Sequence, residues 1–235
     1  MAPIGTAPRQ RSALQLTVLI SGTGSNLRAI LAAIDAGTCD ATVRAVVSDR
    51  ANAQGLSLAS ERSIPTAIVK LSDYENRSTW DAALAHTVAS FDPDLVVLAG
   101  FMKIVGEHML AAFEGRILNV HPALLPAFPG NDAPAQAIAA NVRISGCTVH
   151  VVDGGVDTGP IVAQAAVRVL ANDDAESLHA RIQHAEHTLF PAVIHGIARG
   201  AIKLGARVSA ASGTPSDERA VLLSPAVAPP NDKVP

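Results

Sequence analysis

The alternation of strand and helix patterns over the first hundred residues constrains the fold more than any other feature. Residues 16–20 (LTVLI) form an unbroken apolar run, which is typical of a strand buried on both faces. Residues 25–37 follow with apolar side chains at helical spacing. Further strands are expected at 42–49, 65–71 and 92–101, with helices at 53–63 and 79–91 between them. Because helical crossovers join parallel strands, the pattern predicts an α/β fold with a mostly parallel central sheet and flanking helices.

The pattern changes after residue 115. Residues 116–130 begin as a strand and then break at three prolines. Residues 146–153 and 159–170 are alternating or apolar strands separated by a short loop rich in glycine and aspartate, so we expect them to pair antiparallel in the C-terminal half. Residues 173–200 form a long helical pattern, which Pro191 is expected to bend or divide.

One folded domain is expected over residues 16–204. Residues 1–15 are polar and predict a flexible tail. Residues 205–235 are rich in proline and alanine and contain no aromatic residue. Such a segment buries too little apolar surface to offset its ordering entropy, so it predicts a disordered C-terminal tail.

Composition excludes several classes of function. Hydrophobic residues make up 49% of the chain and charged residues 17%, as in a globular protein. The net charge of −3 and the low aromatic content argue against nucleic-acid binding. No apolar run is long enough to cross a membrane, and the N-terminus lacks the apolar core of a secretory signal. The two cysteines, Cys39 and Cys147, form neither a metal cluster nor a disulfide framework, so a reducing cytoplasm is the expected location.

The loop Ser21-Gly22-Thr23-Gly24-Ser25-Asn26 joins the first strand to the first helix. Glycines let the backbone approach a ligand, and the helix N-terminus offers free N–H groups to a phosphate. The alternative is a tight turn with a serine or asparagine helix cap. Asp49 ends the second strand, which keeps a nicotinamide-dependent oxidoreductase open as a further interpretation.

Asn119 and His121 are two residues apart on an expected strand, so their side chains point to the same side. An amide donor can stabilise a developing oxyanion, and an imidazole can move a proton near neutral pH. The pair suits carbonyl chemistry. The alternative is a strand end with a capped surface histidine.

The loop Asp153–Pro160 carries three glycines and two carboxylates between the antiparallel strands. A carboxylate beside an imidazole stabilises the charged ring, whereas the alternative is a solvated turn whose aspartates bond their own backbone. His150 alternates into an apolar strand and is expected to be a core histidine. The long helix also carries a group of polar residues that lacks the spacing of a zinc protease and is expected on a solvated face: His179, His184, Glu186 and His187.

Taken together, several segments resemble the phosphoribosylglycinamide formyltransferase family. They are ISGTGSNL (20–27), VLAGFMKIV (97–105), ILNVHPALLPAFPG (117–130), GCTVHVVDGGVDTGPIVAQ (146–164) and the helix around Ala185-Glu186-His187. The resemblance covers roughly residues 16–204. It implies a formyltransferase fold whose N-terminal half is a Rossmann-like mononucleotide-binding unit.

The resemblance assigns a role to each matching residue. It implies a catalytic set of Asn119, His121 and Asp157. It implies that the substrate phosphate and ribose are bound by Gly24, Ser25, Asn26 and Glu186. It implies that the folate co-substrate is bound by Arg77, Met102, Lys103, Ile104, Val105 and Asn119. Without the resemblance, the apolar members of that last set would be taken as ordinary core and Arg77 as a surface helix cap.

The implied reaction transfers the formyl group of 10-formyltetrahydrofolate to the amine of glycinamide ribonucleotide, in de novo purine synthesis. Asn119 and His121 would stabilise the oxyanion, and Asp157 would keep His121 protonated. Because the formyl group is already activated, neither ATP nor a metal is required. The expected partners are small molecules, with no nucleic acid and no membrane, and the expected assembly is a monomer or homodimer.

One position departs from the family pattern. Asp132 stands where the family commonly carries a histidine, two residues after Gly130. The departure leaves a non-catalytic binder of folate or phosphoribosyl ligands open as an alternative. Formyltetrahydrofolate hydrolase is a second alternative, because related enzymes use the same Asn–His–Asp set.

Overall fold

The computed structural model describes residues 13–204 together with the short strands at 209–210 and 223–224. The remainder of both expected tails lies outside the described residues. The first strand begins at Leu14, two residues before the expected start of the domain. Its neighbour in the sheet pairs with it from that residue on.

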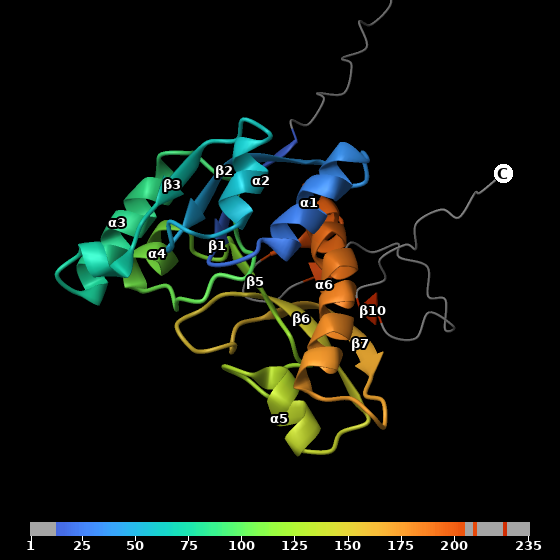
Figure 1. Cartoon of the computed structure of the whole chain (residues 1–235). Coiled ribbons are helices and arrows are strands. Elements are labelled where there is room, and N and C mark those ends of the chain that lie inside the picture. The colour runs from blue at the N-terminus through green and yellow to red at the C-terminus, as the bar shows by residue number, and fades with distance from the viewer. Residues whose placement is uncertain (1–12, 205–208, 211–222, 225–235) are drawn as a thin grey trace, which may run out of the picture.

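Within the described residues, eight strands form one mixed sheet in the order β10-β7-β6-β5-β4-β1-β2-β3 (Figure 1). The strands are β1 (Leu14–Ile20), β2 (Ala41–Ser48), β3 (Thr66–Ile68), β4 (Leu95–Leu98), β5 (Ile117–His121), β6 (Ile144–Val151), β7 (Ile161–Arg168) and β10 (Leu223–Ser224). A separate antiparallel pair joins β8 (Ile202–Lys203) to β9 (Ser209–Ala210). Strands β1 to β5 are parallel, and β6 and β7 are antiparallel to their neighbours, as expected from the sequence. Strand β10, which is antiparallel to β7, lies in the segment expected to be a tail and is not expected from the sequence.

Helices cover both faces of the sheet. They are α1 (Ser25–Asp35), α2 (Gly55–Ser60), α3 (Arg77–Ala89), α4 (Glu107–Ala112), α5 (Ala133–Ala139) and α6 (Ala175–Ala198), with a 3-10 turn η1 (Leu71–Asp73). In Figure 1, α1 and α6 lie side by side on one face, and α3 and α4 lie together on the other. Helices α4 and α5 and the turn η1 are not expected from the sequence.

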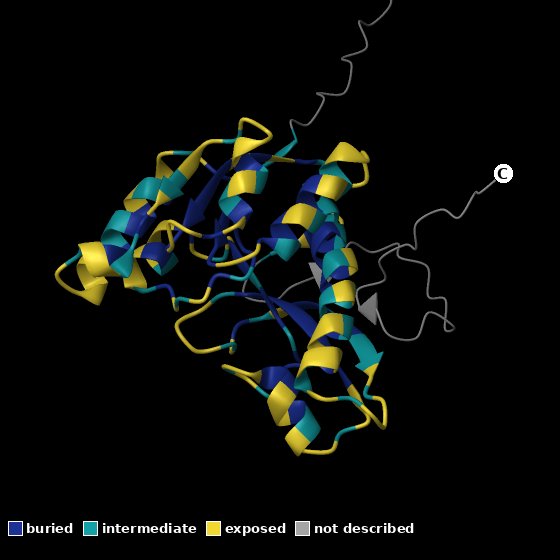
Figure 2. Ribbon diagram, in the orientation of Figure 1, coloured by how far each residue is buried: buried dark blue, intermediate teal, exposed yellow. Residues whose placement is uncertain are grey.

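Strand β1 shows why both faces need a helical layer. Leu16, Val18 and Ile20 pack into a core with α1 and α6, whereas Leu19 packs into a second core with α3 and α4. All four side chains are fully buried, and Figure 2 shows the buried strands between two partly exposed helical layers. An unbroken apolar run is therefore what this strand requires.

The long C-terminal helix runs without interruption through Pro191, so of the two expected effects, bending or dividing the helix, division is wrong. Asp174 begins the helix with a capping box, because its carboxylate accepts from the Ser177 backbone N–H at 2.8 Å. Leu178, Ile182 and Leu189 lie on its buried face. Packing of this face against α1 and the sheet outweighs the one backbone hydrogen bond that a proline removes.

Candidate active site

The carboxyl ends of the parallel strands meet along one edge of the sheet, and most candidate residues lie there. Asn119 and His121 are on β5, with Asn119 opposite His150 of β6 in the antiparallel register. The Nδ2 of Asn119 lies 3.2 Å from the Nε2 of His150. His121 is 4% exposed and ends its strand. The expected placement of the two β5 residues on one side is confirmed.

Asp157 lies between two imidazole rings. Its Oδ2 is 3.3 Å from the Nδ1 of His121, and its Oδ1 is 3.5 Å from the Nε2 of His150. The same Oδ2 accepts from the Gly130 backbone N–H at 2.8 Å. Asp157 has a φ of 56°, a left-handed conformation that is uncommon outside glycine, asparagine and aspartate. The loop therefore holds this carboxylate against both histidines.

The electrostatic balance at Asp157 favours its ionised form. Burial acts to raise the pKa of the Asp157 carboxyl, but it is outweighed by the hydrogen bonds from His150 and Gly130 and by the charges of His121 and His150. The pKa of this group therefore lies below its usual value. The neighbouring Asp153 instead accepts from Gly155 and Thr158 within its own turn. For Asp153, therefore, the alternative of an aspartate that stabilises its own turn is confirmed.

Both ring nitrogens of His121 face acceptors. The Nε2 lies 2.8 Å from the carbonyl oxygen of Phe128, and the Nδ1 faces the Asp157 carboxylate. A carbonyl oxygen and a carboxylate can only accept, so satisfying both requires a hydrogen on each nitrogen. The ring can donate to both acceptors at once only when it carries both hydrogens. A charged donor of this kind is suited to an oxygen on which negative charge develops.

His150 is buried and hydrogen-bonded, as expected for a core histidine, and its partners include two residues of the candidate catalytic set. Its Nδ1 lies 3.1 Å from the carbonyl oxygen of Val151, which as an acceptor fixes a hydrogen on Nδ1. The Nε2 is then free to accept from Asn119 in the neutral ring, or to donate to Asp157 when the ring is protonated. The antiparallel register of β5 and β6 was the signal for this contact, because it places position 150 beside position 119.

The glycine loop sits directly before α1. Gly24 has a φ of 75° and packs against the backbone of α2, where an added Cβ would lie 2.7 Å from the Cα of Gly55. Glycine is required here both by conformation and by space. Helix α1 has no side-chain cap hydrogen bond, so its first N–H groups are available at the start of the helix. The helix-cap alternative is not what the structure contains.

Glu186 reaches this helix from α6. The Nδ2 of Asn26 donates to its Oε2 at 2.9 Å, and both side chains are buried. The expectation that Glu186 lies on a solvated face is therefore wrong, because this side of α6 packs against α1. Burial raises the pKa of the Glu186 carboxyl to about 7, while the hydrogen bond from Asn26 acts in the opposite direction. The Oδ1 of Asn26 has no hydrogen-bond partner in the described part of the chain. His187 is half-buried, which departs from the expected solvated face, and burial lowers its pKa.

The segment after β4 joins the glycine loop. The Oγ of Ser21 accepts from the Met102 backbone N–H at 2.8 Å, and the Ser21 N–H donates to the Gly100 carbonyl at 3.1 Å. Met102 is 69% exposed and Ile104 59%, so neither belongs to the core. Two large apolar side chains are thus exposed near the carboxyl ends of the parallel strands, where the candidate site lies.

Two residues of α3 hold that same segment. The Arg77 guanidinium donates to the Ile104 carbonyl oxygen, so it does more than cap a helix. The buried Asp81 carboxylate accepts from the N–H groups of Gly106 at 2.6 Å, His108 at 2.8 Å and Met109 at 3.2 Å. These three bonds also cap the first turn of α4. The sequence analysis missed Asp81, which has no pattern signal of its own.

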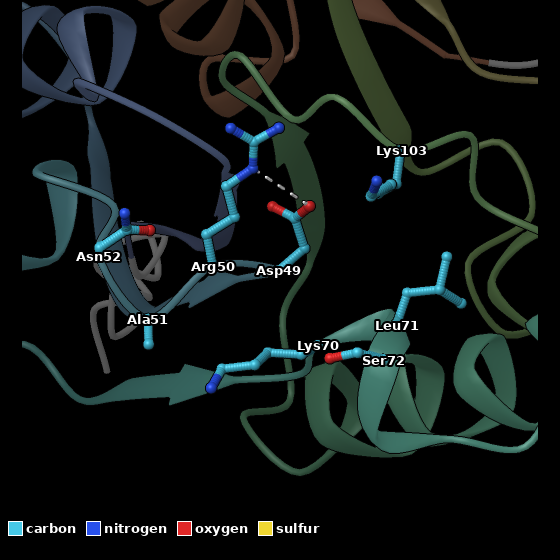
Figure 3. Close-up of a pocket in the computed structure, with 8 residues that line it drawn as sticks. All are labelled: Asp49, Arg50, Ala51, Asn52, Lys70, Leu71, Ser72 and Lys103. Carbon is cyan, nitrogen blue, oxygen red and sulfur yellow. Dashed lines mark ion pairs between the residues drawn. The ribbon is translucent and has the colours of Figure 1, made fainter.

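Two of the residues expected to bind the folate, Val105 and Lys103, are not exposed in the way that Met102 and Ile104 are. Val105 is 5% exposed and packs in the core of α3 and α4, so its side chain serves the fold first. Lys103 lines a pocket together with residues that follow β2 and β3, among them Arg50 and Lys70 (Figure 3). Asp132 is exposed at the N-terminus of α5, with a φ of 55°. Among the described residues, no group of three or more His, Cys, Asp or Glu side chains is placed to hold a metal ion.

Comparison with known proteins identifies the family. The formyl transferase profile matches residues 14–194, starting where β1 starts. The chain belongs to the formyl transferase family. Phosphoribosylglycinamide formyltransferase of Mycobacterium tuberculosis is 47% identical over 195 residues, which span 83% of this chain and 90% of that protein. The Escherichia coli protein of the same name is 40% identical over 191 residues, with 81% and 90% coverage.

Solved structures agree with this membership in the formyl transferase family. The crystal structure of glycinamide ribonucleotide transformylase 1 from Symbiobacterium toebii is 44% identical and superposes with a TM-score of 0.83, covering 87% of this chain and 97% of that one. A formyltetrahydrofolate deformylase from Pseudomonas syringae superposes with a TM-score of 0.78 at 22% identity, which speaks to the shared fold alone. No helix among the described residues is long and apolar enough to cross a membrane.

Proposed function

We propose that the chain transfers the formyl group of 10-formyltetrahydrofolate to the glycinamide amine of phosphoribosylglycinamide. The products are the formylglycinamide ribonucleotide and tetrahydrofolate, in de novo purine synthesis. The observation that carries this proposal is the contact of Asp157 with His121 and, through His150, with Asn119 at the carboxyl edge of the sheet. The match to relatives named for this activity covers 90% of the length of those proteins, which supports the proposal.

The ribonucleotide is assigned to the start of α1. Gly24, Ser25 and Asn26 lie where the free N–H groups and the positive end of the helix favour a phosphate. Glu186 lies beside Asn26 and would accept hydrogen bonds from the ribose hydroxyls. The Oδ1 of Asn26 lacks a partner among the residues that the structure describes, which supports a ligand here, because a buried polar atom without a partner costs about 1–3 kcal/mol.

The folate is assigned to the segment held by α3. Exposed Met102 and Ile104 offer apolar contact to its ring system, and Arg77 and Lys103 offer positive charge to its carboxylates. Ser21 bonds this segment to the glycine loop, so the two substrates would lie on adjoining parts of one edge. This set of side chains fits an elongated ligand with an aromatic end and an anionic end.

The reaction needs one proton to leave the amine and one to arrive at the departing nitrogen. The glycinamide nitrogen bonds to the formyl carbon, and the bond between that carbon and N10 of the folate then breaks. Negative charge develops on the formyl oxygen in between. The Asn119 amide and the His121 imidazolium would donate to that oxygen, each in place of a contact made within the protein. Donors of this kind contribute roughly 10²–10³ in rate each.

The Asp157 carboxylate would stabilise the positive charge of the His121 ring. At 3.3 Å, its contact with the ring is longer than a strong charge-assisted bond, which typically measures about 2.7–2.9 Å. Catalytic contacts are often long before substrate binds and then tighten. The ionised carboxylate would keep the ring protonated and would relay the amine proton through the ring or through water. His150 would orient both Asn119 and Asp157 without touching substrate.

Folate turnover tests the proposal directly. Purified protein is mixed with 10-formyltetrahydrofolate, with and without the ribonucleotide, and folate absorbance is followed. We expect turnover that depends on the ribonucleotide and needs no ATP. Turnover without any acceptor would identify a hydrolase instead. Folate binding without turnover would identify a binder that keeps the pocket but not the reaction.

A variant tests the assignment of the two substrates to separate parts of the site. Ser25→Asp places negative charge at the start of α1, where the phosphate is assigned. We expect it to raise the KM for the ribonucleotide at least tenfold and to leave the KM for the folate nearly unchanged. A raised folate KM with an unchanged ribonucleotide KM would reverse the assignment. Our expectation of a monomer or homodimer is checked by light scattering on the same preparation.

A further inference from the structure

The segment between β5 and α5 brings two backbone groups to the candidate catalytic set. The Phe128 carbonyl oxygen lies 2.8 Å from the Nε2 of His121, and the Gly130 N–H donates to Asp157 at 2.8 Å. Phe128 has a φ of 57°, a left-handed conformation that a bulky side chain rarely adopts. Because this residue does not favour its own backbone conformation, contacts from elsewhere in the fold must hold the segment in place.

The side-chain amide of Gln164 reaches this segment from β7. Its Nε2 donates to the Leu125 carbonyl oxygen at 2.9 Å and to the Oγ1 of Thr148 at 3.0 Å. The Thr148 hydroxyl, from β6, donates in turn to the Ala123 carbonyl oxygen at 2.6 Å and accepts from the Leu125 N–H at 3.0 Å. Both backbone polar groups of Leu125 are therefore held by side chains of the β6–β7 pair.

This small network uses all the hydrogen-bonding capacity of its central atoms. A hydroxyl has one hydrogen to donate and two lone pairs, and the Thr148 hydroxyl uses each of them. A carbonyl oxygen only accepts, so the amide nitrogen of Gln164, and not its oxygen, must face Leu125. Thr148 is fully buried. A buried network whose members are all satisfied is rigid.

The sheet fixes the two side chains that make this network. Thr148 and Gln164 are directly opposite each other in the antiparallel register of β6 and β7, and Gln164 is also paired with β10 on its other side. Their neighbours Cys147 and Ala165 pack in the core beneath α6. Because side chains alternate along a strand, Thr148 and Gln164 point to the opposite face, where the segment after β5 lies.

The far end of the segment is held less firmly. There the Nε2 of Gln136, on α5, donates to the Asn131 carbonyl oxygen at 2.8 Å and to the Pro129 carbonyl oxygen at 3.3 Å. Gln136 is exposed, whereas Gln164 is half-buried and bonds to a buried hydroxyl. Water competes for the donors of an exposed amide, so the bonds of Gln164 contribute more to holding the segment.

We propose that Gln164 is a positioning residue for the reaction, acting through the backbone of Leu125. Its amide sets the path of the segment after β5, and that path brings the two backbone groups of the segment to His121 and Asp157. Catalysis is sensitive to such placement, since a displacement of about 1 Å can cost roughly 100-fold in rate. The inference rests on the proposed function, because it concerns the reaction assigned to this site.

Gln164→Leu removes both donors and keeps a side chain of similar bulk. We expect kcat to fall about 10- to 100-fold and the KM for the ribonucleotide to change less than about twofold, because that substrate is assigned to the start of α1. Gln15→Leu is the matched control. Gln15 is also a half-buried strand glutamine whose amide donates to a backbone carbonyl oxygen, but it lies at the amino end of β1. It should keep the wild-type kcat.

Gln164→Glu keeps the shape of the side chain and makes the same test if Gln164→Leu does not fold. At pH 8 its carboxylate would face the Leu125 carbonyl oxygen, and two acceptors cannot bond to each other. We expect its kcat, relative to that of the wild type at the same pH, to recover in part as pH is lowered to 5, because the protonated acid regains one donor. A ratio of 1 at every pH would overturn the inference.

Nuclear magnetic resonance separates positioning from a general loss of stability. The ring ¹⁵N resonances of His121 report the partner of its Nε2, and they are recorded without substrate. In Gln164→Leu we expect them to move, while those of the exposed His86 on α3 stay in place and chemical unfolding remains cooperative. A folded variant that loses kcat with unchanged His121 resonances would overturn the inference, because the loss would then not pass through the segment.

A double variant tests whether the two side chains act on the same peptide. Thr148→Val removes the hydroxyl and keeps the branched shape. If Thr148 and Gln164 both act through Leu125, the variant Thr148→Val with Gln164→Leu should have a kcat close to that of the more impaired single variant, since residues that share a partner are not additive. Independent effects that multiply would contradict this shared route.

The two proposals fail in different ways. Absence of formyl transfer by the wild-type protein would contradict the proposed function, whereas the response of the His121 resonances to Gln164→Leu would still be measurable. Efficient transfer by the wild type, together with a Gln164→Leu variant that keeps both its kcat and its His121 resonances, would retain the proposed function and overturn the further inference.

Discussion

Asn26 donates to Glu186 across 2.9 Å, and this buried bond joins two helices whose residues are 160 positions apart in the chain. The carboxyl that accepts it has a pKa raised to about 7 by burial, from an ordinary value of 4.5. Folding therefore favours the protonated acid. Stability attributable to this group is fully present below about pH 4.5 and is lost as pH rises through 7, at a cost of about 3 kcal/mol.

Glu186→Gln removes that cost while keeping an acceptor for Asn26. Above pH 8 we expect the variant to unfold at a temperature several degrees above that of the wild type, and near pH 4 we expect no gain. Because Glu186 is assigned to the ribose, the KM for the ribonucleotide should rise about tenfold or more. Differential scanning calorimetry across pH and initial-rate kinetics measure the two effects. Glu114→Gln, at an exposed site, should change neither.

His121→Asn removes the charged donor of the candidate active site. We expect kcat to fall by roughly 10²–10⁴ while the affinity for the ribonucleotide changes little. Steady-state kinetics and calorimetry separate the two quantities. His86→Asn replaces an exposed histidine on α3 and should behave as wild type. A His121→Asn enzyme with normal kcat would remove this residue from the mechanism.

Asp81→Asn disrupts the segment that carries Met102 to Ile104. An amide offers one acceptor and turns an N–H group toward donors, so backbone groups near Gly106 lose their partner. We expect a loss of stability of about 2–3 kcal/mol and a several-fold rise in the KM for the folate, measured by chemical unfolding and kinetics. Asp94→Asn is the matched control, because Asp94 accepts from one backbone N–H, that of Gln15. It should leave the folate KM unchanged.

Asp132→His restores an imidazole two residues after Gly130, whose N–H bonds the Asp157 carboxylate. A group that titrates near neutral pH would then stand close to the candidate catalytic set. We expect the pH profile of kcat to shift, as followed from pH 5 to 9. Identical profiles for the two proteins would show that the position is peripheral to the reaction.

Most of the architecture could be predicted from the sequence because its strands are buried on both faces. The apolar run of β1 needs helices on either side, and the antiparallel β6 and β7 follow from the short loop between them. The short helix α4 could not be predicted in this way. Its first turn is capped by Asp81 from another helix, so its start is specified by a tertiary contact and not by its own residues.

The candidate site could be predicted only in part. Asn119 and His121 share a strand, and the strand period places them together. Asp157 reaches His121 from a loop whose left-handed backbone has no distinctive sequence signal beyond its glycines. His150 has the sequence pattern of a core residue, and it is buried as that pattern predicts. Only the register of β5 against β6 reveals that it lies beside Asn119.

Gly24 and Gly55 meet backbone to backbone, and neither position has room for one more carbon atom. A Cβ on Gly24 would strike the Cα of Gly55, and a Cβ on Gly55 would strike the side chain of Ile20. No compensating change at Gly55 can relieve the first collision, because a glycine has no side chain to shorten, whereas a smaller residue at position 20 would relieve the collision with Ile20. Position 24 is therefore closed to stepwise divergence, and the shape of the loop before α1 is inherited with its glycine.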